Sequence, residues 1–426
     1  MNKKVIFLWM SFWLIFSASV RAEASLFWTL DSSVQRAMEV APEMKTADAE
    51  VGKKQGALQQ AGAWPNPSLD IQMDDNLGIE DGSGGYDMTR MAISQALPLG
   101  RLADQHKQAS AALASAEAQR RQQQLLLEHK VAGRFHALQL AEAELQLAEK
   151  RLQQASRYQR SGKDPLIRYL TPLERMRLDI VLQAAKQTVD VAEGEYNEAA
   201  TSFKTLLAIP LENKLQLVPL GPVPKPANFE ALLERLQAHP ALEANKQALA
   251  SAQAGVDVAK SRRFADPTIT LFQEKGYFAN GEQDVTGVAL NIQIPLWNMN
   301  NGSVVQARQE VYQAQSQSLT TQRELRTNLH KSYLHLGHLI EQARHYRDKL
   351  LQPAQQVFKL THKGFAAGEL NILSLIDANN TYFDAKDRYQ ELLQQGWLEL
   401  AEVRKSAGLS LLHSNSATYS REVKKP

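Results

Sequence analysis

The sequence predicts a mixed α+β membrane protein whose single chain holds the same arrangement of short strands and very long helices twice. Two sets of proline-bearing motifs carry this duplication. Pro67 and Pro267 precede the first strand of each copy, and Leu97-Pro98-Leu99 and Ile294-Pro295-Leu296 end the second strand. After each exit comes a run of about sixty residues with very little Pro or Gly, which is typical of a long helix. A period of about 200 residues indicates a duplicated architecture, since the unit of a solenoid is roughly 20–50 residues.

The first residues have the features of a secretory signal peptide, which we assign to residues 1–22. Lys3 and Lys4 are followed by an apolar run over 5–16 and by small residues that end at Ala22. The run is shorter than a bilayer span, so a membrane-anchoring helix is the less favoured alternative. We therefore expect an exported protein.

The composition excludes several kinds of site. The chain contains no cysteine. It therefore has no disulfide framework, no thiolate metal site and no thiol for N-terminal lipid attachment, so we do not expect a lipoprotein. Its formal net charge of +2 gives no indication of nucleic-acid binding.

Two strand hairpins are predicted, over about 67–98 and about 267–296. In the first, Leu69, Ile71 and Met73 share one face and polar residues occupy the other. The last strand shows the same alternation, whereas the strand over 268–278 alternates poorly and is predicted mainly from its partner. Strands with one apolar and one polar face are typical of transmembrane β-strands, although two soluble hairpins packed on a core would show the same pattern.

If these strands cross a membrane, one chain cannot be complete. Four strands are too few to close around a lumen, and an open sheet edge in lipid leaves unpaired backbone groups that cost several kcal/mol each. Other copies of the chain must supply the missing edges. We therefore expect an obligate homo-oligomer.

Long helices are predicted over about 101–160 and 302–365, each on the order of 90 Å long at 1.5 Å per residue. Apolar residues repeat at steps of three and four along both helices, as in a coiled coil. Shorter partner helices are expected over 172–208 and 371–408.

The remaining segments complete the two copies. Further helices are expected over about 31–62 and 229–264, before the hairpins. The first repeat is assigned to 23–208 and the second to 229–411. A proline-rich linker over 209–228 joins the repeats, and residues 412–426 are expected to form a flexible tail.

Taken together, these features resemble the TolC-type outer-membrane efflux proteins, over about residues 26–409. Short motifs at the strand and helix boundaries are similar to those of the CzcC-like branch, which serves heavy-metal pumps of the resistance–nodulation–division (RND) class. These motifs are Trp64-Pro65-Asn66-Pro67, Gln95-Ala96-Leu97-Pro98-Leu99-Gly100-Arg101, Thr171-Pro172-Leu173-Glu174, Ile294-Pro295-Leu296-Trp297 and Asn300-Asn301-Gly302.

The resemblance implies a homotrimer in the outer membrane of a Gram-negative bacterium. Three chains would form a twelve-stranded barrel and a helical tunnel in the periplasm. The tunnel tip would dock on a periplasmic adaptor, and an inner-membrane RND pump would supply the energy. Such a protein is a passive channel and not an enzyme, and divalent metal cations are the substrates that the branch suggests.

The resemblance also assigns roles to residues near the helical turns. It implies a periplasmic gate at Phe365, Gly368, Ser374 and Asp377, in which three Asp377 carboxylates around a symmetry axis would favour cations. A solvated acid near a helix start is the alternative for Asp377. Candidate positions for adaptor docking lie at both turns, although a charged exposed loop is the commoner explanation for the first. These positions are Arg160, Gly162, Lys163, Asp164 and Gly364.

The sequence predicts neither a catalytic site nor a cofactor. Four histidines lie in one predicted helix, and two of them are three residues apart, which can present both rings on one face. Because no carboxylate cluster completes a ligand set, we expect no metal site there. The histidines are His330, His335, His338 and His345.

Two alternatives to a metal-efflux channel remain open at this point. A channel of the same fold could serve drug efflux or type I protein secretion. A periplasmic coiled-coil scaffold without a pore would also have an export signal and long helices.

Overall fold

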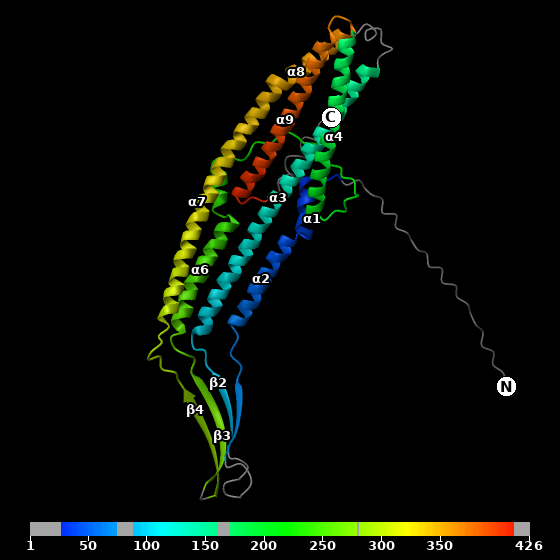
Figure 1. The fold of residues 1–426 in the computed structure, drawn as a ribbon. Coiled ribbons are helices and arrows are strands. Elements are labelled where there is room, and N and C mark those ends of the chain that lie inside the picture. The colour runs from blue at the N-terminus through cyan, green and yellow to red at the C-terminus, as the bar shows by residue number, and fades with distance from the viewer. Residues whose placement is uncertain (1–26, 75–87, 161–170, 279–280, 413–426) are drawn as a thin grey trace, which may run out of the picture.

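The computed structural model describes residues 27–74, 88–160, 171–278 and 281–412. The predicted signal peptide, the turn around Gly162 and most of the predicted tail lie outside these residues. Figure 1 shows an elongated molecule with the sheet at one end and long helices running away from it to the other end. Among the described helices, none is both long and apolar enough to cross a membrane.

The four strands in the described part of the chain belong to one antiparallel sheet in the order β1-β2-β3-β4. The strands are β1 (Ser68–Asp74), β2 (Met88–Ala96), β3 (Thr268–Phe278) and β4 (Gly281–Asn291). The two predicted hairpins are therefore joined, because β2 of the first copy pairs with β3 of the second over nine residue pairs from Met88↔Gly276 to Ala96↔Thr268.

Two boundaries of the last strand differ from the prediction. β4 begins at Gly281, within the turn that the sequence predicts over 279–282, and ends at Asn291 rather than near residue 296. Asn291 pairs with Thr268, the first residue of β3, so later residues have no partner strand. Pro295 also lacks the amide hydrogen that a ladder needs.

The register places apolar side chains on one face of the sheet. Leu69, Ile93, Leu271 and Val288 follow one another across the four strands. All four are exposed, from 54% for Ile93 to 70% for Val288. On the other face, the hydroxyl oxygens of Ser94 and Thr270 lie 2.8 Å apart. The sheet thus has one apolar and one polar face.

The described residues of the first predicted copy form four helices. They are α1 (Leu30–Val40), α2 (Pro42–Ala61), α3 (Arg101–Arg160) and α4 (Pro172–Leu206). In the second copy the corresponding elements are α5 (Phe229–Leu236), α6 (Pro240–Ser261), α7 (Asn301–Tyr346), a five-residue π-helical turn (Arg347–Leu351), α8 (Gln352–Ala366) and α9 (Ile372–Ser406).

Three helices that the sequence predicts as continuous are interrupted by proline. The expected helices over 31–62 and 229–264 are each divided, because Pro42 and Pro240 start new helices at the first-turn position where a missing amide hydrogen is tolerated. The expected helix over 302–365 contains the π-helical turn just before Pro353. Proline removes a helical hydrogen bond and crowds the carbonyl four residues earlier, and a wider turn accommodates both effects.

The largest apolar core lies where the linker crosses the helices. Val34, Leu138 and Phe203 are fully buried there. Trp28 forms a parallel bridge with Leu217 of the linker. The indole of Trp397 in α9 donates a hydrogen bond to the Gly221 carbonyl at 2.8 Å. The linker is therefore packed against both copies.

The chain beyond α9 is anchored where the described residues end. The amide of Leu411 donates a hydrogen bond of 2.6 Å to the carboxylate of Glu128, which is buried in α3. Residues 413–426, which make up all but the first residue of the predicted flexible tail, lie outside the described part.

Candidate functional site

Two glycines shape the turn between α8 and α9 at the helical tip. Gly368 has a φ of +78°, a left-handed conformation that favours glycine, and its amide donates to the Phe365 carbonyl at 3.0 Å. At Gly364, a Cβ atom would lie 2.7 Å from Leu370 Cδ1. Gly364 therefore lets Leu370 fold back over the end of α8, which makes the turn compact.

Asn371 caps the helix that carries the predicted gate. The side-chain oxygen of Asn371 accepts hydrogen bonds from the Ser374 amide at 2.9 Å and from its hydroxyl at 3.0 Å. Asp377 lies three residues further along α9 and is exposed. The structure thus leaves the Asp377 carboxylate accessible and commits the Ser374 hydroxyl to the cap.

Apolar packing joins the start of α9 to the first copy. Ile372 and Leu375 are buried with Leu178 of α4, and Tyr158 and Phe365 are half-buried against them. Phe365, predicted as a gate residue, therefore packs into this cluster within one chain. The cluster fixes the gate-bearing end of α9 against the α3–α4 hairpin.

A polar contact beside this cluster links three helices. Tyr158 Oη in α3 lies 2.7 Å from His362 Nε2 in α8, and the amide nitrogen of Asn379 in α9 donates to the same hydroxyl at 3.3 Å. Burial lowers the pKa of His362, although the hydrogen bond with Asn379 opposes this. The two copies are thus joined at the tip by packing and by hydrogen bonds.

Only the edges of the first-copy tip are described. α3 ends at Arg160, and α4 begins after Thr171, whose hydroxyl accepts from the Glu174 amide while its own amide donates to Glu174 Oε2 at 2.8 Å. The other docking candidates of this turn, Gly162, Lys163 and Asp164, lie outside the described residues.

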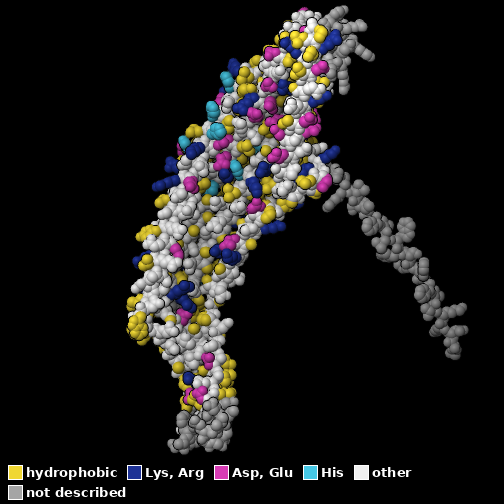
Figure 2. Space-filling view, in the orientation of Figure 1, with side chains coloured by type: hydrophobic (Ala, Val, Ile, Leu, Met, Phe, Trp, Pro, Cys, Tyr) yellow, Lys and Arg dark blue, Asp and Glu magenta, His cyan; other side chains and the backbone are white. Residues whose placement is uncertain are grey.

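Below the tip lies a hollow lined by acids that the sequence did not predict. This acidic crevice, of about 290 Å³, lies between α3, α4 and α9. On the face shown in Figure 2, acidic side chains gather in the upper half of the molecule. The charged side chains that line the crevice are Glu144, Arg151, Glu195, Asp384, Asp387 and Glu391.

Burial and repulsion between neighbouring charges raise the pKa of acids that line the crevice. Loss of hydration, followed by the charges of Asp387, Glu195 and Glu391, raises the pKa of Glu144 to about 7. Loss of hydration, followed by the charges of Glu391, Asp384 and Glu195, raises the pKa of Asp387 against the effect of Arg151. A signal was present in the sequence, because acids spaced three and four residues apart in α9 share one face, but their meeting with α3 and α4 depends on the fold.

The four histidines of the predicted helix do not come together. Figure 2 shows histidines along the edge formed by α7. His335 Nδ1 lies 3.0 Å from a carboxylate oxygen of Glu399, and the His330 ring lies 5.3 Å from the Phe229 ring. Among the described residues no group of three or more potential ligands could hold a metal ion.

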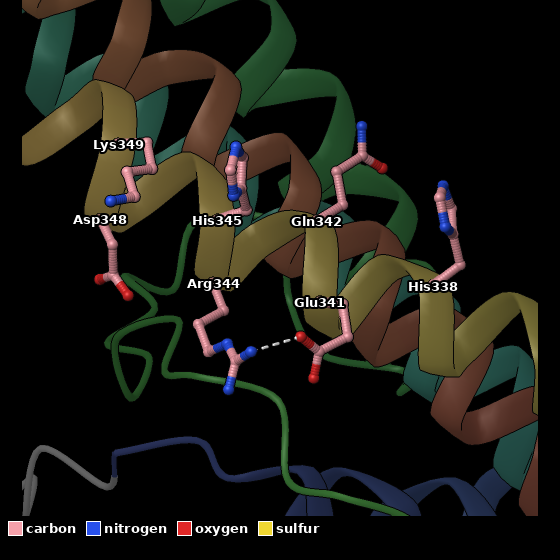
Figure 3. A pocket seen from close by; sticks show the side chains of 7 residues that line it. All are labelled: His338, Glu341, Gln342, Arg344, His345, Asp348 and Lys349. Atoms are coloured by element: carbon pink, nitrogen blue, oxygen red, sulfur yellow. Dashed lines mark ion pairs between the residues drawn. The ribbon is translucent and has the colours of Figure 1, made fainter.

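The other two histidines line an open hollow of about 580 Å³ beside the π-helical turn. In Figure 3, His338, Gln342 and His345 point to one side of the helix, whereas Glu341, Arg344 and Asp348 point to the other. Arg344 pairs with Glu341 at 2.7 Å. These side chains form the exposed face of one helix rather than a convergent site.

Comparison with known proteins connects this architecture to a family. The family described as "Outer membrane efflux protein" matches residues 33–164 and 232–409, which lie in the two copies. The cobalt-zinc-cadmium resistance protein CzcC of Cupriavidus metallidurans is 26% identical over 384 residues, covering 86% of this chain and 87% of that protein.

Solved structures of similar fold include two channels. The open state of the Neisseria gonorrhoeae MtrE outer membrane channel matches with a TM-score of 0.73 at 17% identity, covering 90% of this chain and 89% of that one. CusC, whose structures concern transmembrane channel formation, matches with a TM-score of 0.68 at 17% identity, covering 89% and 92%. The predicted TolC-type resemblance is confirmed.

Proposed function

This chain belongs to the outer membrane efflux protein family and is an outer-membrane efflux channel. We propose that it is the exit duct of a tripartite efflux system for divalent metal cations. The duct conducts passively. An inner-membrane RND pump supplies the energy, and a periplasmic adaptor connects the two. The family match favours this function over a periplasmic scaffold without a pore.

The sheet is the observation that carries the proposal. Its apolar face is exposed, and β1 and β4 are its outer strands. Because lipid does not tolerate unpaired backbone groups, these edges must pair with other copies of the chain. Three chains would give twelve strands in one barrel and would place the long helices around a common tunnel.

The substrate class rests on the similarity to CzcC along most of the chain. A duct need not bind its cargo tightly, which agrees with the dispersed histidines of α7. The test is a deletion strain assayed for tolerance to zinc, cobalt, cadmium, copper and drugs, with the intact gene restored as control. Sensitivity to metals alone supports the proposal. Sensitivity to drugs alone, or a defect in protein secretion, would assign the channel to another substrate.

We place the periplasmic gate at the start of α9. Asp377 is exposed near the tip. The turn at Gly368, the packing of Phe365 and the Asn371 cap, which accepts from Ser374, hold that helix end in position. Three Asp377 carboxylates would form a ring that attracts cations. Because Ser374 is not acidic, this ring contains a single acid from each chain.

Neutralising this acid should change conduction. Asp377→Asn is expected to raise single-channel conductance and to reduce the preference for cations in planar bilayers, since it removes three charges from the constriction. Asp190→Asn, at an exposed position of α4, is the matched control and should leave both quantities unchanged. Wild-type conductance and selectivity in Asp377→Asn would remove the gate assignment.

Adaptor docking is assigned to the two turns of the tip. The first contributes Arg160, Gly162, Lys163 and Asp164, and the second is shaped by Gly364. Reversing the charge in Lys163→Glu should weaken chemical cross-linking to the adaptor and lower metal tolerance, without reducing the amount of channel in the outer membrane. Undiminished cross-linking would exclude this turn as the docking site.

The export route follows from the first residues of the sequence. Cleavage after Ala22 would leave a mature chain that begins at Glu23. N-terminal sequencing of the protein from outer-membrane fractions tests this assignment. A mature chain that retained Lys3 and Lys4 would contradict it.

A further inference from the structure

The acidic crevice lies between the helix that carries the proposed gate and two helices of the other copy. α3 and α4 belong to the first copy, whereas α9 belongs to the second and carries Asp377. Asp384, Asp387 and Glu391 lie in α9, seven to fourteen residues beyond Asp377. A change in the distance of α9 from α3 and α4 at the crevice will therefore shift the helix that carries the gate residue.

The crevice carries more negative than positive charge. Glu144 lies on the same face of α3 as Arg151, seven residues away, with Leu147 and Ala148 between them. From α4 comes Glu195, and from α9 come Asp384, Asp387 and Glu391. Among the described residues lining the crevice, Arg151 is the one basic side chain.

Arg151 makes the polar contacts across the crevice from α3 to α9. Its guanidinium donates to the side-chain oxygen of Asn380 at 2.7 Å and lies 3.4 Å from Asp384 Oδ1. It also lies 6.0 Å from the centre of the Phe383 ring. Because these contacts use one face of α9, they hold that helix against α3.

Three further cations contact or influence this region without lining the crevice. Arg388 pairs with Glu391 of the same helix. Lys386 is half-buried, and both the loss of hydration and the charge of Lys150 in α3 lower its pKa. Neither lysine lines the hollow, so the acids face one another with Arg151 as the cation between them.

We propose that the acidic crevice is a proton-dependent joint that sets how closely α9 lies against α3 and α4. With a proton on Glu144, repulsion across the crevice is relieved and the three helices close. Loss of that proton adds a negative charge opposite Glu195, Asp387 and Glu391, and the helices separate. The joint itself depends only on the geometry of one chain, whereas its effect on conduction rests on the proposed gate.

The pH range of the joint agrees with its setting. Burial and neighbouring acids raise the pKa of Glu144 to about 7, so its charge changes near neutral pH rather than near its usual value of 4.5. Removing an acid that faces it should make its proton easier to lose. Glu195→Gln and Asp387→Asn should therefore each move the transition to lower pH.

The absence of native cysteine allows the joint to be measured directly. Spin labels are attached to cysteines at two exposed positions outside the crevice, in the variants Gln187→Cys on α4 and Thr381→Cys on α9. Labelled full-length chains are mixed with an excess of unlabelled chains before reconstitution, so that distances within one chain are read by pulsed electron paramagnetic resonance. The pH is varied from about 5 to about 9, a range that spans the raised pKa.

The distance between the labels should increase with pH through a transition near neutrality. Glu144→Gln should abolish the transition and keep the short distance, whereas Glu149→Gln, at an exposed position on the same helix, should leave it unchanged. A distance that does not depend on pH in the wild type would overturn the proposal. The proposal would also be overturned if the transition in Glu195→Gln and Asp387→Asn occurred at the wild-type pH. These two variants keep the test decisive if Glu144→Gln does not assemble.

Conductance recorded over the same pH range separates this proposal from the proposed function. A distance change without a conductance change supports the joint and contradicts its coupling to the gate. Absence of conductance at every pH would contradict the channel assignment while leaving the distance measurement valid.

Discussion

At the scale of single residues, the Phe272 ring on the polar face of the sheet occupies the space beside a glycine. The guanidinium of Arg90 lies 4.7 Å from the centre of the Phe272 ring. Gly287 pairs with Phe272 in the register of β3 and β4. A Cβ atom at position 287 would lie 2.5 Å from Phe272 Cζ. Glycine therefore leaves the space that the ring occupies.

Gly287→Ala should destabilise the sheet by about 1–3 kcal/mol, the usual cost of overpacking, because the Phe272 ring must move. The measurement is thermal unfolding of the purified protein. Gly337→Ala is the control, since nothing lies within 4 Å of a Cβ atom there. In the middle of α7 it should stabilise by roughly 0.5–1 kcal/mol. Equal stability of Gly287→Ala and the wild type would show that the ring is not confined.

Some residue roles could be predicted from the sequence, and others could not. The alternation of Leu69, Ile71 and Met73 predicted a shared face, and the structure places them on the exposed side of the sheet. The contact of Gly287 with Phe272 depends on strand register, which no local pattern specifies. Likewise, Glu144 meets Asp387 only because two distant helices pack together.

At the scale of elements, the composition of the helices predicted their lengths better than their interruptions. α3 runs without a break through residues that include no proline. The sequence predicted continuous helix at three places where the structure has a break or a wide turn, namely Pro42, Pro240 and the residues before Pro353. Proline at the start of a helix is stabilising and in its interior is disruptive, so its position within the turn decides the outcome.

A second set of contacts between α3 and α9 responds to pH in the opposite direction from the crevice. A carboxylate oxygen of Glu402 lies 3.0 Å from His129 Nε2 and 2.6 Å from Lys405 Nζ. The hydrogen bond with His129 contributes most to lowering the pKa of Glu402 to about 2, against the effect of burial. Its stabilising contribution is therefore present above pH 4.5 and is lost as the pH falls through about 2.

Glu402→Gln should lower the free energy of unfolding by about 1–3 kcal/mol at neutral pH, because it removes a charged hydrogen-bond acceptor. The variant should then lose less stability than the wild type on acidification below pH 4.5. Denaturant unfolding at a series of pH values measures both effects. Glu193→Gln, at an exposed position of α4, is the control. Parallel curves for Glu402→Gln and the wild type would contradict the assignment.

At the scale of the whole molecule, the two copies are joined at both ends. Figure 1 shows the sheet at one end and the turn between α8 and α9 at the other. β2 and β3 pair across the copies at the first end, and Tyr158, His362 and Asn379 connect them at the second. The repeat predicted similar halves but not these joins, because pairing between residues about 170 or more apart depends on the fold.

The apolar face of the sheet should determine membrane insertion. Leu290→Arg places a charge on that face and should cost roughly 2–4 kcal/mol if the residue lies near the middle of the membrane. Asn291→Arg, one residue further along and on the opposite face, should be tolerated. The measurement is the yield of assembled, heat-modifiable oligomer in outer-membrane fractions. Equal yields from both variants would mean that this face does not contact lipid.

In the proposed assembly, copies of this chain close together into a duct across the outer membrane. The most direct measurement is the electrical conductance of a planar lipid bilayer after addition of the protein purified from outer membranes. We predict discrete and uniform conductance steps carried by an oligomer of three chains. A bilayer that stays electrically silent, with the protein recovered as a water-soluble monomer, would show that the chain does not form such a duct.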